Sequence, residues 1–355
     1  MTSSVQTAVV GVTGYAGAEL ARLLLHHPHL QAKPPVFAGR VDEKDAARGG
    51  TPLAEIHPWL ADSHGNGNLK QEPFSWELLE SRGVDVLFLA TPHEQSREWV
   101  PIALSRGIRV IDLSGAWRLS EPSNRAVYKF SDEGTDEAKN IQERAVYGIP
   151  ELHRDQILGA HVVANPGCYA TSVILALRPL VAAGLVDLGC GIVADSKSGV
   201  SGAGKAPTAT THFMHAADNL SAYGLFSHRH TGELLEQIGL AADQIIFTPH
   251  LLPIPRGILS TIYVRFADVQ THESIARVYH EFFAGSPMVR LYSHHLPQIQ
   301  DSVRTNYCDI GFQLAPDGRR AVIVSCLDNL LKGASSQAVQ NLNVMLGWPE
   351  SEGLE

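Results

Sequence analysis

A glycine-rich turn near the start of the chain is the feature that most restricts its fold. The stretch "GVTGYAGAEL" places Gly11, Gly14 and Gly17 at the junction between the β-branched run Gln6–Val12 and a helical pattern. Glycine permits a tight turn with close backbone approach, and the N–H groups at a helix N-terminus bind phosphate. The spacing is G-x-x-G-x-x-G rather than G-x-G-x-x-G, but the strand-turn-helix context is the one this motif requires. We predict a dinucleotide-binding βα unit, with a tight βα turn that holds no ligand as the alternative.

Strand and helix patterns alternate through the first third of the 355-residue chain. Val84–Ala90 and Ile108–Leu113 are short, largely apolar runs, separated by a helical stretch over His93–Arg106. Strands that lack a polar face and alternate with helices are typical of a parallel sheet covered on both faces. We therefore predict an N-terminal α/β domain with a doubly wound, Rossmann-like sheet.

The pattern changes after about Asn165, where longer strand-like runs are separated by fewer helices. This change predicts an α+β second domain with a mostly antiparallel sheet. A chain of this length exceeds one ordinary core, so two domains are expected: 1–165 for cofactor binding and 166–329 for catalysis and oligomerisation. The last segment, 330–355, reads as one amphipathic helix that packs back on the first domain. The stretch Ser63–Gln71 reads as an exposed loop.

Charge and cysteine content restrict the partners and the compartment. The formal net charge of −9 argues against nucleic acid as a partner, because phosphate backbones require a basic face. No segment approaches the roughly 18 consecutive apolar residues of a membrane span. The N-terminus lacks a basic region followed by an apolar core, and four scattered cysteines do not make a disulfide framework. A reducing cytoplasm is the expected location.

The end of the second predicted strand bears on which dinucleotide is bound. An NAD site usually carries Asp or Glu there for the ribose hydroxyls, whereas this chain has Gly39 and Arg40. A guanidinium suits a 2′-phosphate. The sequence therefore favours NADP(H) over NAD(H).

A second glycine-rich stretch, "GVSGAGKA" (Gly199–Ala206), comes within one residue of a Walker A motif. Ala206 stands where Ser or Thr would hold Mg²⁺, and Pro207 follows directly. A P-loop NTPase is therefore the weaker hypothesis. We expect these glycines to let the backbone pass close to a cofactor or a substrate phosphate.

Cys168 follows Asn165-Pro166-Gly167 at the start of a long apolar helical run. A helix N-terminus favours the thiolate form of cysteine, which is the nucleophilic form. The pattern alone leaves two readings open: a packing residue after a turn, or a nucleophile. The other three cysteines, Cys190, Cys308 and Cys326, lie in strand-like apolar runs and are expected to be inert core residues.

A nucleophilic cysteine needs a base, and the chain has 17 histidines. His228 and His230 flank Arg229 ahead of a predicted helix start, so two imidazoles and a guanidinium are concentrated there. A solvated helix cap is the alternative. No His, Cys or Asp spacing matches a metal site, so no metal is predicted.

Ten segments in order resemble the N-acetyl-γ-glutamyl-phosphate reductases of the semialdehyde dehydrogenase family. The segments are "GVTGYAGAEL", "LATPH", "DLSGAWRL", "YGIPEL", "ANPGCYAT", "KSGVSGAGK", "HRHTGEL", "TPHLLPIPRGIL", "TNYCDIG" and "DNLLKGASSQAVQN". The related aspartate-semialdehyde dehydrogenases usually carry a His soon after the Arg-Gly of the eighth segment, where this chain has Ile258 after Gly257. The chain departs from the usual pattern at "SGAW", Ala170 and Gly232, without loss of a polar catalytic group. Gly39 replaces the usual Ser before Arg40, which weakens the case for a 2′-phosphate.

The resemblance implies NADPH-dependent reduction of an acyl phosphate through a thioester on Cys168, with aspartate-semialdehyde dehydrogenase-like chemistry as the alternative. It assigns the acid/base role to His230, with His228 as the alternate. For the cofactor it implies Gly11, Thr13, Gly14, Tyr15, Ala16, Gly17, Arg40, Thr91, Pro92, His93, Ser114, Gly199, Ser201, Gly202, Gly204 and Asn329. For the substrate it implies Arg118, Asn165, Lys205, Arg256 and Glu233. It also implies a homo-oligomer, either a dimer or a tetramer.

Overall fold

The computed structural model describes residues 5–62, 65–132 and 134–355. The chain divides into two compact units. Unit 1 comprises Met1–Arg118, Phe130–Asn165 and Ser335–Glu355, and unit 2 comprises Leu119–Lys129 and Pro166–Ala334. Each unit is therefore built from segments that are distant in the sequence.

Unit 1 holds an eight-stranded sheet in the order β3-β4-β2-β1-β5-β6-β8-β7. Every neighbouring pair is parallel except β3 with β4. The strands are β1 (Thr7–Val10), β2 (Val36–Gly39), β3 (Thr51–Pro52), β4 (Lys70–Pro73), β5 (Val86–Leu89), β6 (Arg109–Asp112), β7 (Val146–Tyr147) and β8 (Val162–Ala164). The helices are α1 (Tyr15–Leu25), α2 (Glu43–Ala47), α3 (Leu53–Ile56), α4 (Trp76–Ser81), α5 (His93–Ser105), α7 (Asp136–Arg144), α8 (Pro150–Ile157) and α14 (Ser336–Leu346).

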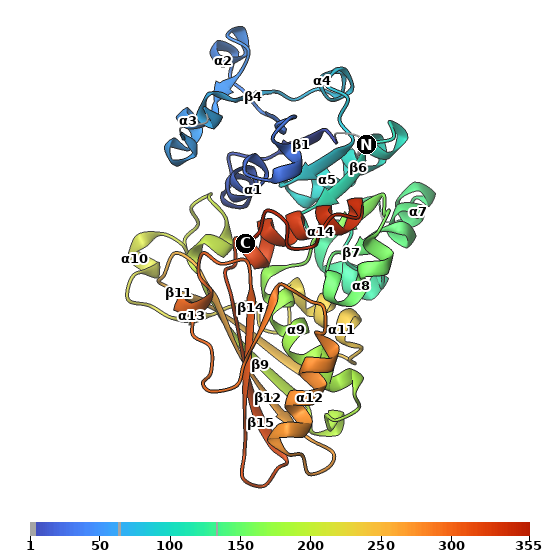
Figure 1. Cartoon of the computed structure of the whole chain (residues 1–355), viewed down its shortest axis with the longest axis vertical. Coiled ribbons are helices and arrows are strands. Elements are labelled where there is room, and N and C mark those ends of the chain that lie inside the picture. The colour runs from blue at the N-terminus through green and yellow to red at the C-terminus, as the bar shows by residue number, and fades with distance from the viewer. Residues whose placement is uncertain (1–4, 63–64, 133) are drawn as a thin grey trace. The chain divides into compact units, whose positions relative to one another are not determined.

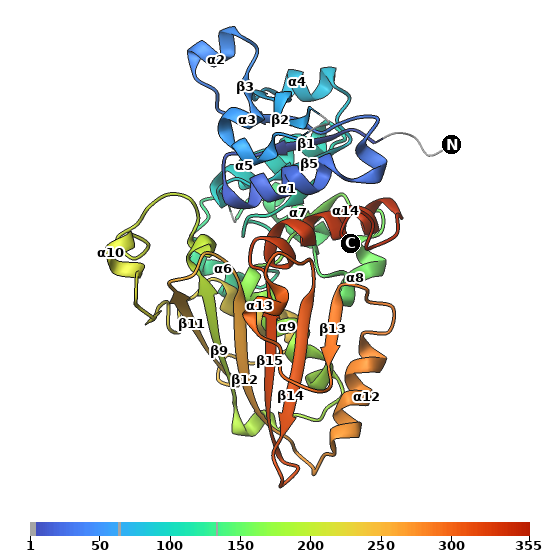
Figure 2. The same ribbon diagram turned by 60° about the vertical axis from the view of Figure 1, so that its left-hand side comes forward.

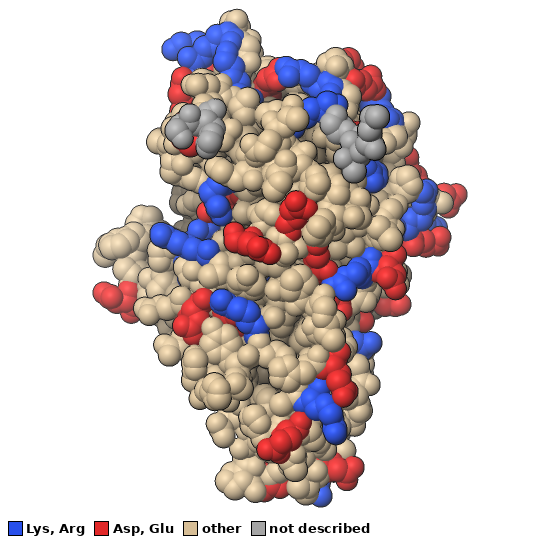
Figure 3. Space-filling model, viewed as in Figure 1, with Lys and Arg blue, Asp and Glu red and all other residues tan. Residues whose placement is uncertain are grey.

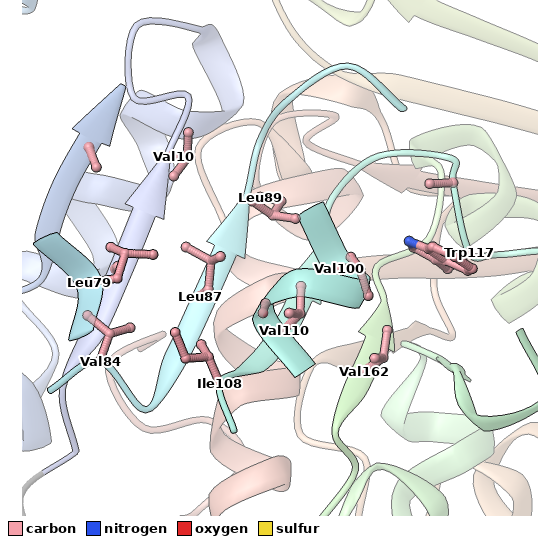
Figure 4. Packing of buried hydrophobic residues seen from close by; sticks show 14 of the residues in the cluster. Val10, Leu79, Val84, Leu87, Leu89, Val100, Ile108, Val110, Trp117 and Val162 are labelled. Atoms are coloured by element: carbon pink, nitrogen blue, oxygen red, sulfur yellow. The ribbon is translucent and has the colours of Figure 1, made fainter. Parts of the chain in front are cut away.

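The core of unit 1 lies against this sheet (Figure 4). Every residue of β1 and of β5 is buried, as expected for strands covered on both faces. Leu87, Val100, Val110 and Trp117 belong to one apolar cluster that joins strands to α5 and to the segment after β6. Burial of each such Val or Leu side chain contributes about 1.5–3 kcal/mol. The predicted parallel, doubly wound fold is confirmed.

Unit 2 holds a seven-stranded sheet in the order β10-β11-β9-β12-β15-β14-β13. Four neighbouring pairs are antiparallel and two, β11 with β9 and β13 with β14, are parallel. The strands are β9 (Ile192–Gly199), β10 (Ser221–Ala222), β11 (Ile245–Leu252), β12 (Ile258–Arg265), β13 (Val289–Tyr292), β14 (Cys308–Leu314) and β15 (Arg320–Leu327). The helices are α6 (Pro122–Arg125), α9 (Cys168–Ala182), α10 (Phe213–Ala216), α11 (His230–Ile238), α12 (His272–Phe282) and α13 (Ile299–Ser302). The predicted mostly antiparallel sheet is confirmed.

Helix α9 is the central helix of unit 2. It packs on β9, β12, β14 and β15, and α11 and α12 pack on it in turn. Figure 1 shows these three helices on one side of the sheet, and Figure 2 shows its strands side by side. The hydroxyl of Ser172 in α9 also lies within hydrogen-bonding distance of the Ser260 and Ser325 hydroxyls, at 2.9 and 3.0 Å. These contacts fix the position of the first residue of the helix, Cys168.

The C-terminal helix differs from the prediction of one amphipathic helix. A π-helical turn, Leu331–Ser335, precedes α14, and every residue of α14 from Ser336 to Met345 is buried. The polar side chains of Gln337 and Asn341 do not form a solvent face, because both donate hydrogen bonds to the carbonyl of Gly148. Polar residues that looked solvent-facing thus have partners from distant segments of unit 1.

The stretch expected to be an exposed loop over Ser63–Gln71 also differs in part. Ser63 and His64 lie outside the described residues. Strand β4 begins at Lys70, and Gln71 is buried between β2 and β3. The polar sequence of this short strand concealed its place in the sheet.

Charged side chains of both signs are interspersed on the face shown in Figure 3. Among the residues that the structure describes, no helix combines the length and the apolarity needed to cross a membrane.

Candidate active site

The glycine turn of unit 1 has a geometry that glycine alone satisfies. Gly11 has φ of +98°, and a Cβ there would collide with the backbone of Ala90. A Cβ on Gly17 would collide with the carbonyl group of Gly11. Gly14 is the N-cap of α1, donates to the Gly11 carbonyl at 3.1 Å and supplies no capping side chain. The helix N-terminus beside this turn therefore suits an anionic group.

A pocket of about 440 Å³ lies at this turn in unit 1. Its lining residues are Val10, Gly11, Thr13, Gly39, Arg40, Gln71, Phe74, Thr91, Pro92, Gln95 and Trp99. The rings of Phe74 and Trp99 stack with centroids 4.1 Å apart and give the pocket an aromatic wall. Thr91 Oγ1 is buried and bonds to no residue that the structure describes. A glycine turn, a guanidinium, aromatic rings and an unsatisfied hydroxyl together fit the phosphates and adenosine of a dinucleotide.

The residues predicted to bind the cofactor divide into groups. Gly11, Thr13, Arg40, Thr91 and Pro92 line the pocket. Gly14, Tyr15, Ala16 and Gly17 form the turn and the start of α1. His93 and Ser114 lie outside the pocket lining.

The side chain of Ser114 bonds within unit 1. Its Oγ donates to Oδ2 of Asp112 at 2.8 Å, and burial raises the pKa of that carboxyl group. His93 Nε2 lies 3.0 Å from Oε1 of Glu94. These contacts position the loops after β5 and β6.

Two predicted substrate residues are held in unit 1. Arg118 donates from Nε to the Asn165 carbonyl at 2.7 Å and from a terminal nitrogen to the Leu113 carbonyl at 2.8 Å. Asn165 is 1% exposed, and its Oδ1 accepts from Asn341 at 2.9 Å. These bonds join the segments after β6 and β8.

Six lining residues were not among those predicted to bind the cofactor: Val10, Gly39, Gln71, Phe74, Gln95 and Trp99. Gln71 and Phe74 lie in and directly after β4, and ligands bind beside the carboxyl ends of strands in open α/β sheets. The signal in the sequence is Phe74, an aromatic residue directly after β4. The prediction of a loop over Ser63–Gln71 concealed it.

In unit 2, Cys168 is the first residue of α9 and Gly167 is its N-cap. The N–H of Gly167 donates to Oε2 of Glu233 at 2.9 Å, and Glu233 is completely buried. A Cβ on Gly167 would collide with the imidazole of His230, and one on Gly333 would lie 2.7 Å from Cys168 Cβ. The half-buried thiol therefore lies at a helix start that two glycines allow to be closely packed.

The two predicted histidines occupy different environments. His230 begins α11, its ring lies against Gly167, and its Nε2 is 3.9 Å from Oε1 of Glu233. His228 Nδ1 accepts the backbone N–H of His230 at 3.1 Å, so the neutral ring carries its proton on Nε2. Burial, assisted by Arg229, lowers the pKa of His228 to about 4.

Aromatic rings account for the burial of His228. Tyr169, Tyr223 and Phe247 each place a ring centroid between 5.4 and 5.6 Å from that of His228. Partial burial raises the pKa of Tyr223, whose residue is 40% exposed, to about 12. At neutral pH both side chains are uncharged.

The second glycine-rich stretch packs on backbone. Gly199 N–H donates to the Gly257 carbonyl at 2.9 Å, and a Cβ on Gly199 would lie 2.7 Å from the Arg256 nitrogen. Asn329 accepts from the Gly257 N–H at 2.8 Å and donates to Ser201 Oγ at 2.9 Å. These bonds hold the loop that contains Gly202 and Gly204.

The Walker A hypothesis is wrong. A P-loop runs from a strand into an α-helix, whereas a short 3₁₀ turn, Val200–Ala203, follows β9 here. Gly204 then takes φ of +90°, and Lys205 is exposed in the loop beyond it. No helix N-terminus is available to cradle a nucleotide phosphate at this point.

Arg256 is oriented by an ion pair. Its Nε lies 3.4 Å from Oδ2 of Asp328, which is completely buried. Asp328 also accepts the backbone N–H groups of Arg304 and Leu330 at 2.8 Å. No group of three or more His, Cys, Asp or Glu side chains suited to a metal ion occurs within the described ranges.

A dinucleotide-binding α/β unit followed by a sheet unit with a cysteine at a helix start defines the chain as an NAD(P)-dependent oxidoreductase. Residues 6–160 match the model of the semialdehyde dehydrogenase NAD binding domain, and residues 168–329 match the semialdehyde dehydrogenase dimerisation domain. The chain belongs to the semialdehyde dehydrogenase family.

Curated relatives from three organisms carry the name N-acetyl-gamma-glutamyl-phosphate reductase. The Desulforapulum autotrophicum protein is 40% identical over 99% of this chain and 98% of its own length. Those of Geobacter metallireducens and Methanocaldococcus jannaschii are 42% and 40% identical, each over 98% of this chain and 97% of its own length. The resemblance predicted from the ten segments is confirmed.

Solved structures agree with the fold. Aspartate semialdehyde dehydrogenase II from Vibrio cholerae in complex with ASA superposes with a TM-score of 0.69 at 17% identity, covering 96% of this chain and 98% of the other. The enzyme from Francisella tularensis gives 0.67 at 14% identity, covering 96% and 99%. At this identity the likeness concerns the fold alone.

Proposed function

We propose that this chain reduces N-acetyl-γ-glutamyl phosphate to N-acetylglutamate semialdehyde with NADPH and releases phosphate. The observation that carries the proposal is the arrangement of Cys168, Gly167, His230 and Glu233 at the start of α9. The names of the relatives supply the substrate, and Ile258 after Gly257 favours it over aspartyl phosphate. The product belongs to arginine biosynthesis.

The reaction begins at Cys168. Its thiolate attacks the acyl carbon, the carbon–oxygen bond to phosphate breaks, and a thioester forms on Sγ. Backbone N–H groups at the start of α9 stabilise the negative charge that develops on the carbonyl oxygen. When bound, NADPH supplies the hydride that reduces the thioester carbon. The carbon–sulfur bond then breaks, which releases the aldehyde and restores the thiolate.

His230 is assigned the proton transfers at the substrate oxygen. Its ring lies against Gly167, beside the helix start that carries Cys168, and buried Glu233 orients it. His228 is neutral and uses Nδ1 to accept the His230 N–H, which suits a supporting role. General acid/base catalysis of this kind contributes about 10²–10⁴-fold in rate.

Charged residues are assigned to the substrate by their exposure and partners. Arg256, oriented by Asp328, is assigned to the substrate carboxylate, and exposed Lys205 to the departing phosphate. Arg118 binds two backbone carbonyls, so we assign it to positioning the β6 and β8 loops, not to the phosphate. Arg40 in the unit 1 pocket is assigned to the 2′-phosphate of NADP(H).

The dimerisation domain of unit 2 supports a homo-oligomer, and we propose a dimer or a tetramer in the cytoplasm. The decisive test of the function is a substrate panel read by NADPH oxidation. N-acetylglutamyl phosphate should be reduced with a kcat/KM at least 100-fold above that for aspartyl phosphate. Preference for aspartyl phosphate would overturn the assignment.

A further inference from the structure

Gln71 is a buried polar residue of unit 1 that the reaction described above does not use. It is 3% exposed and lies in β4, paired with Phe37 of β2 and Thr51 of β3. Its Nε2 donates to the Arg40 carbonyl at 2.9 Å. Its Oε1 is also buried, and within the part of the chain that the structure describes no group donates to it. Buried acceptors are almost always satisfied, so this oxygen points to a donor on a ligand.

Gly39 provides the space that the Gln71 carboxamide occupies. A Cβ on Gly39 would lie 3.1 Å from both Cδ and Nε2 of Gln71, so the amide lies directly on the glycine. Gly39 ends β2, where an acidic residue usually binds the ribose hydroxyls of NAD. Gln71, Gly39 and Arg40 all line the same pocket. A carboxamide from the neighbouring strand thus lies beside the position that such an acid would occupy.

The charge of this group matters because Arg40 is adjacent. Among the described residues, none forms an ion pair or a hydrogen bond with the Arg40 guanidinium. A carboxylate at Gln71 would attract that guanidinium and repel a phosphate in the same pocket. A carboxamide accepts a hydrogen bond from a hydroxyl without adding negative charge.

We propose that Gln71 is a specificity-determining residue for the dinucleotide. Its Oε1 accepts a hydrogen bond from the 3′-hydroxyl of the adenosine ribose, and its neutrality leaves Arg40 to bind the 2′-phosphate. The bond from Nε2 to the Arg40 carbonyl holds the end of β2 in place for both contacts. This inference rests on the proposed use of NADP(H).

Calorimetric titration with 2′,5′-ADP and 5′-AMP tests the proposal without catalysis. Gln71→Glu keeps the shape of the side chain and adds charge, so its affinity for 2′,5′-ADP should fall at least 10-fold while that for 5′-AMP is unchanged or tighter. Gln71→Met removes the acceptor and should lower the affinities for 2′,5′-ADP and 5′-AMP by a similar factor, about 3- to 10-fold. Gln313→Glu is the matched control, because it makes the same change of charge on an exposed side chain of β14, outside the pocket lining, and should change the ratio of affinities less than 3-fold.

The outcomes separate this inference from the proposed function. An unchanged affinity ratio in Gln71→Glu, while Arg40→Ala loses its preference for 2′,5′-ADP, would overturn the role of Gln71 and leave NADP(H) use intact. A wild-type chain that shows no preference for 2′,5′-ADP would instead overturn the proposed use of NADP(H). If Gln71→Glu does not fold, as judged by its thermal melting curve, unchanged binding in Gln71→Met would be decisive against the proposal.

Discussion

The backbone N–H of Gly167 donates a 2.9 Å hydrogen bond to Oε2 of Glu233, a carboxylate with no solvent exposure. The other carboxylate oxygen of Glu233 lies 3.9 Å from Nε2 of His230. One buried carboxylate thus binds the N–H of the residue that precedes Cys168 and lies beside the imidazole of His230. The start of α9 and the ring of His230 therefore depend on the same side chain, Glu233.

Changes at Glu233 should separate its structural role from its positioning role. Glu233→Gln keeps an acceptor for the Gly167 N–H but removes the charge beside His230, so kcat should fall about 10–100-fold with KM nearly unchanged. Glu233→Ala also removes the acceptor from a buried N–H, which costs about 1–3 kcal/mol of unfolding free energy. Steady-state kinetics and urea unfolding of both variants would measure the two effects. A rise in KM with unchanged kcat in Glu233→Gln would instead indicate substrate binding.

Cys168→Ala should abolish reductase activity while binding of NADPH to unit 1 is preserved. The thioester cannot form without Sγ, whereas the pocket residues are unaffected. Isothermal titration with NADPH and a coupled turnover assay would check both expectations. Cys190→Ala is the matched control, because Cys190 is not in the core as expected but exposed at the end of the 3₁₀ turn Leu188–Cys190, where its thiol bonds to Asp187. Appreciable turnover by Cys168→Ala would overturn the covalent mechanism.

The histidine variants should differ in rate. His230→Asn should lose about 10²–10⁴-fold in kcat through loss of the acid/base group. His228→Asn keeps an acceptor for the His230 N–H and should lose less than about 10-fold. A reversed order would exchange the roles assigned to the two residues.

His228 also predicts a pH dependence of stability. Its folded-state pKa, about 4, lies below the ordinary value of 6.5, so the unfolded chain binds this proton first as the pH falls. The free energy of unfolding should therefore decrease between about pH 6.5 and pH 4, by up to about 3 kcal/mol from this group. Urea unfolding of wild type and His228→Asn at pH 7.5, 5.5 and 4.5 would isolate it. Parallel pH profiles of the two proteins would contradict the prediction.

Arg40→Ala should reverse the preference between dinucleotides. A hydrogen bond to a charged group is worth about 1.5–3 kcal/mol, so KM for NADPH should rise about 10–100-fold. KM for NADH, which lacks the 2′-phosphate, should change less than about 3-fold. Initial rates with each cofactor would measure the ratio. A preference of the wild-type enzyme for NADH would contradict the assignment of Arg40 to the 2′-phosphate.

Features encoded by neighbouring residues could be predicted from the sequence. The turn with Gly11 and Gly17 and the helix start at Cys168 each depend on a few consecutive residues, and the structure contains both. The short strands β1 and β5 were predictable because both of their faces are covered, which makes every consecutive residue buried.

Features that depend on distant partners could not be predicted. Gln71 is the buried residue of a short polar strand that pairs with β2 and β3, and its local sequence does not indicate that pairing. Two polar residues of α14, Gln337 and Asn341, are satisfied in a buried position because the Gly148 carbonyl accepts their hydrogen bonds. The difference between His228 and His230 likewise depends on the rings of Tyr223 and Phe247, which lie beside His228.

The glycine turn offers a final prediction with an internal control. Gly17→Ala places a methyl group against the carbonyl of Gly11, which is backbone and cannot yield, so the turn must shift. We expect a loss of about 1–3 kcal/mol in unfolding free energy and a loss of NADPH affinity. Gly14→Ala places its methyl group 3.5 Å from the same carbonyl oxygen, an ordinary contact, at an N-cap φ of −82° that alanine adopts readily. Both variants add one methyl group to the same turn, yet their melting temperatures and NADPH affinities should differ. Thermal melting and calorimetric titration would measure them. Equal values for the two variants would show that the close approach of Gly17 to Gly11 does not shape the phosphate site.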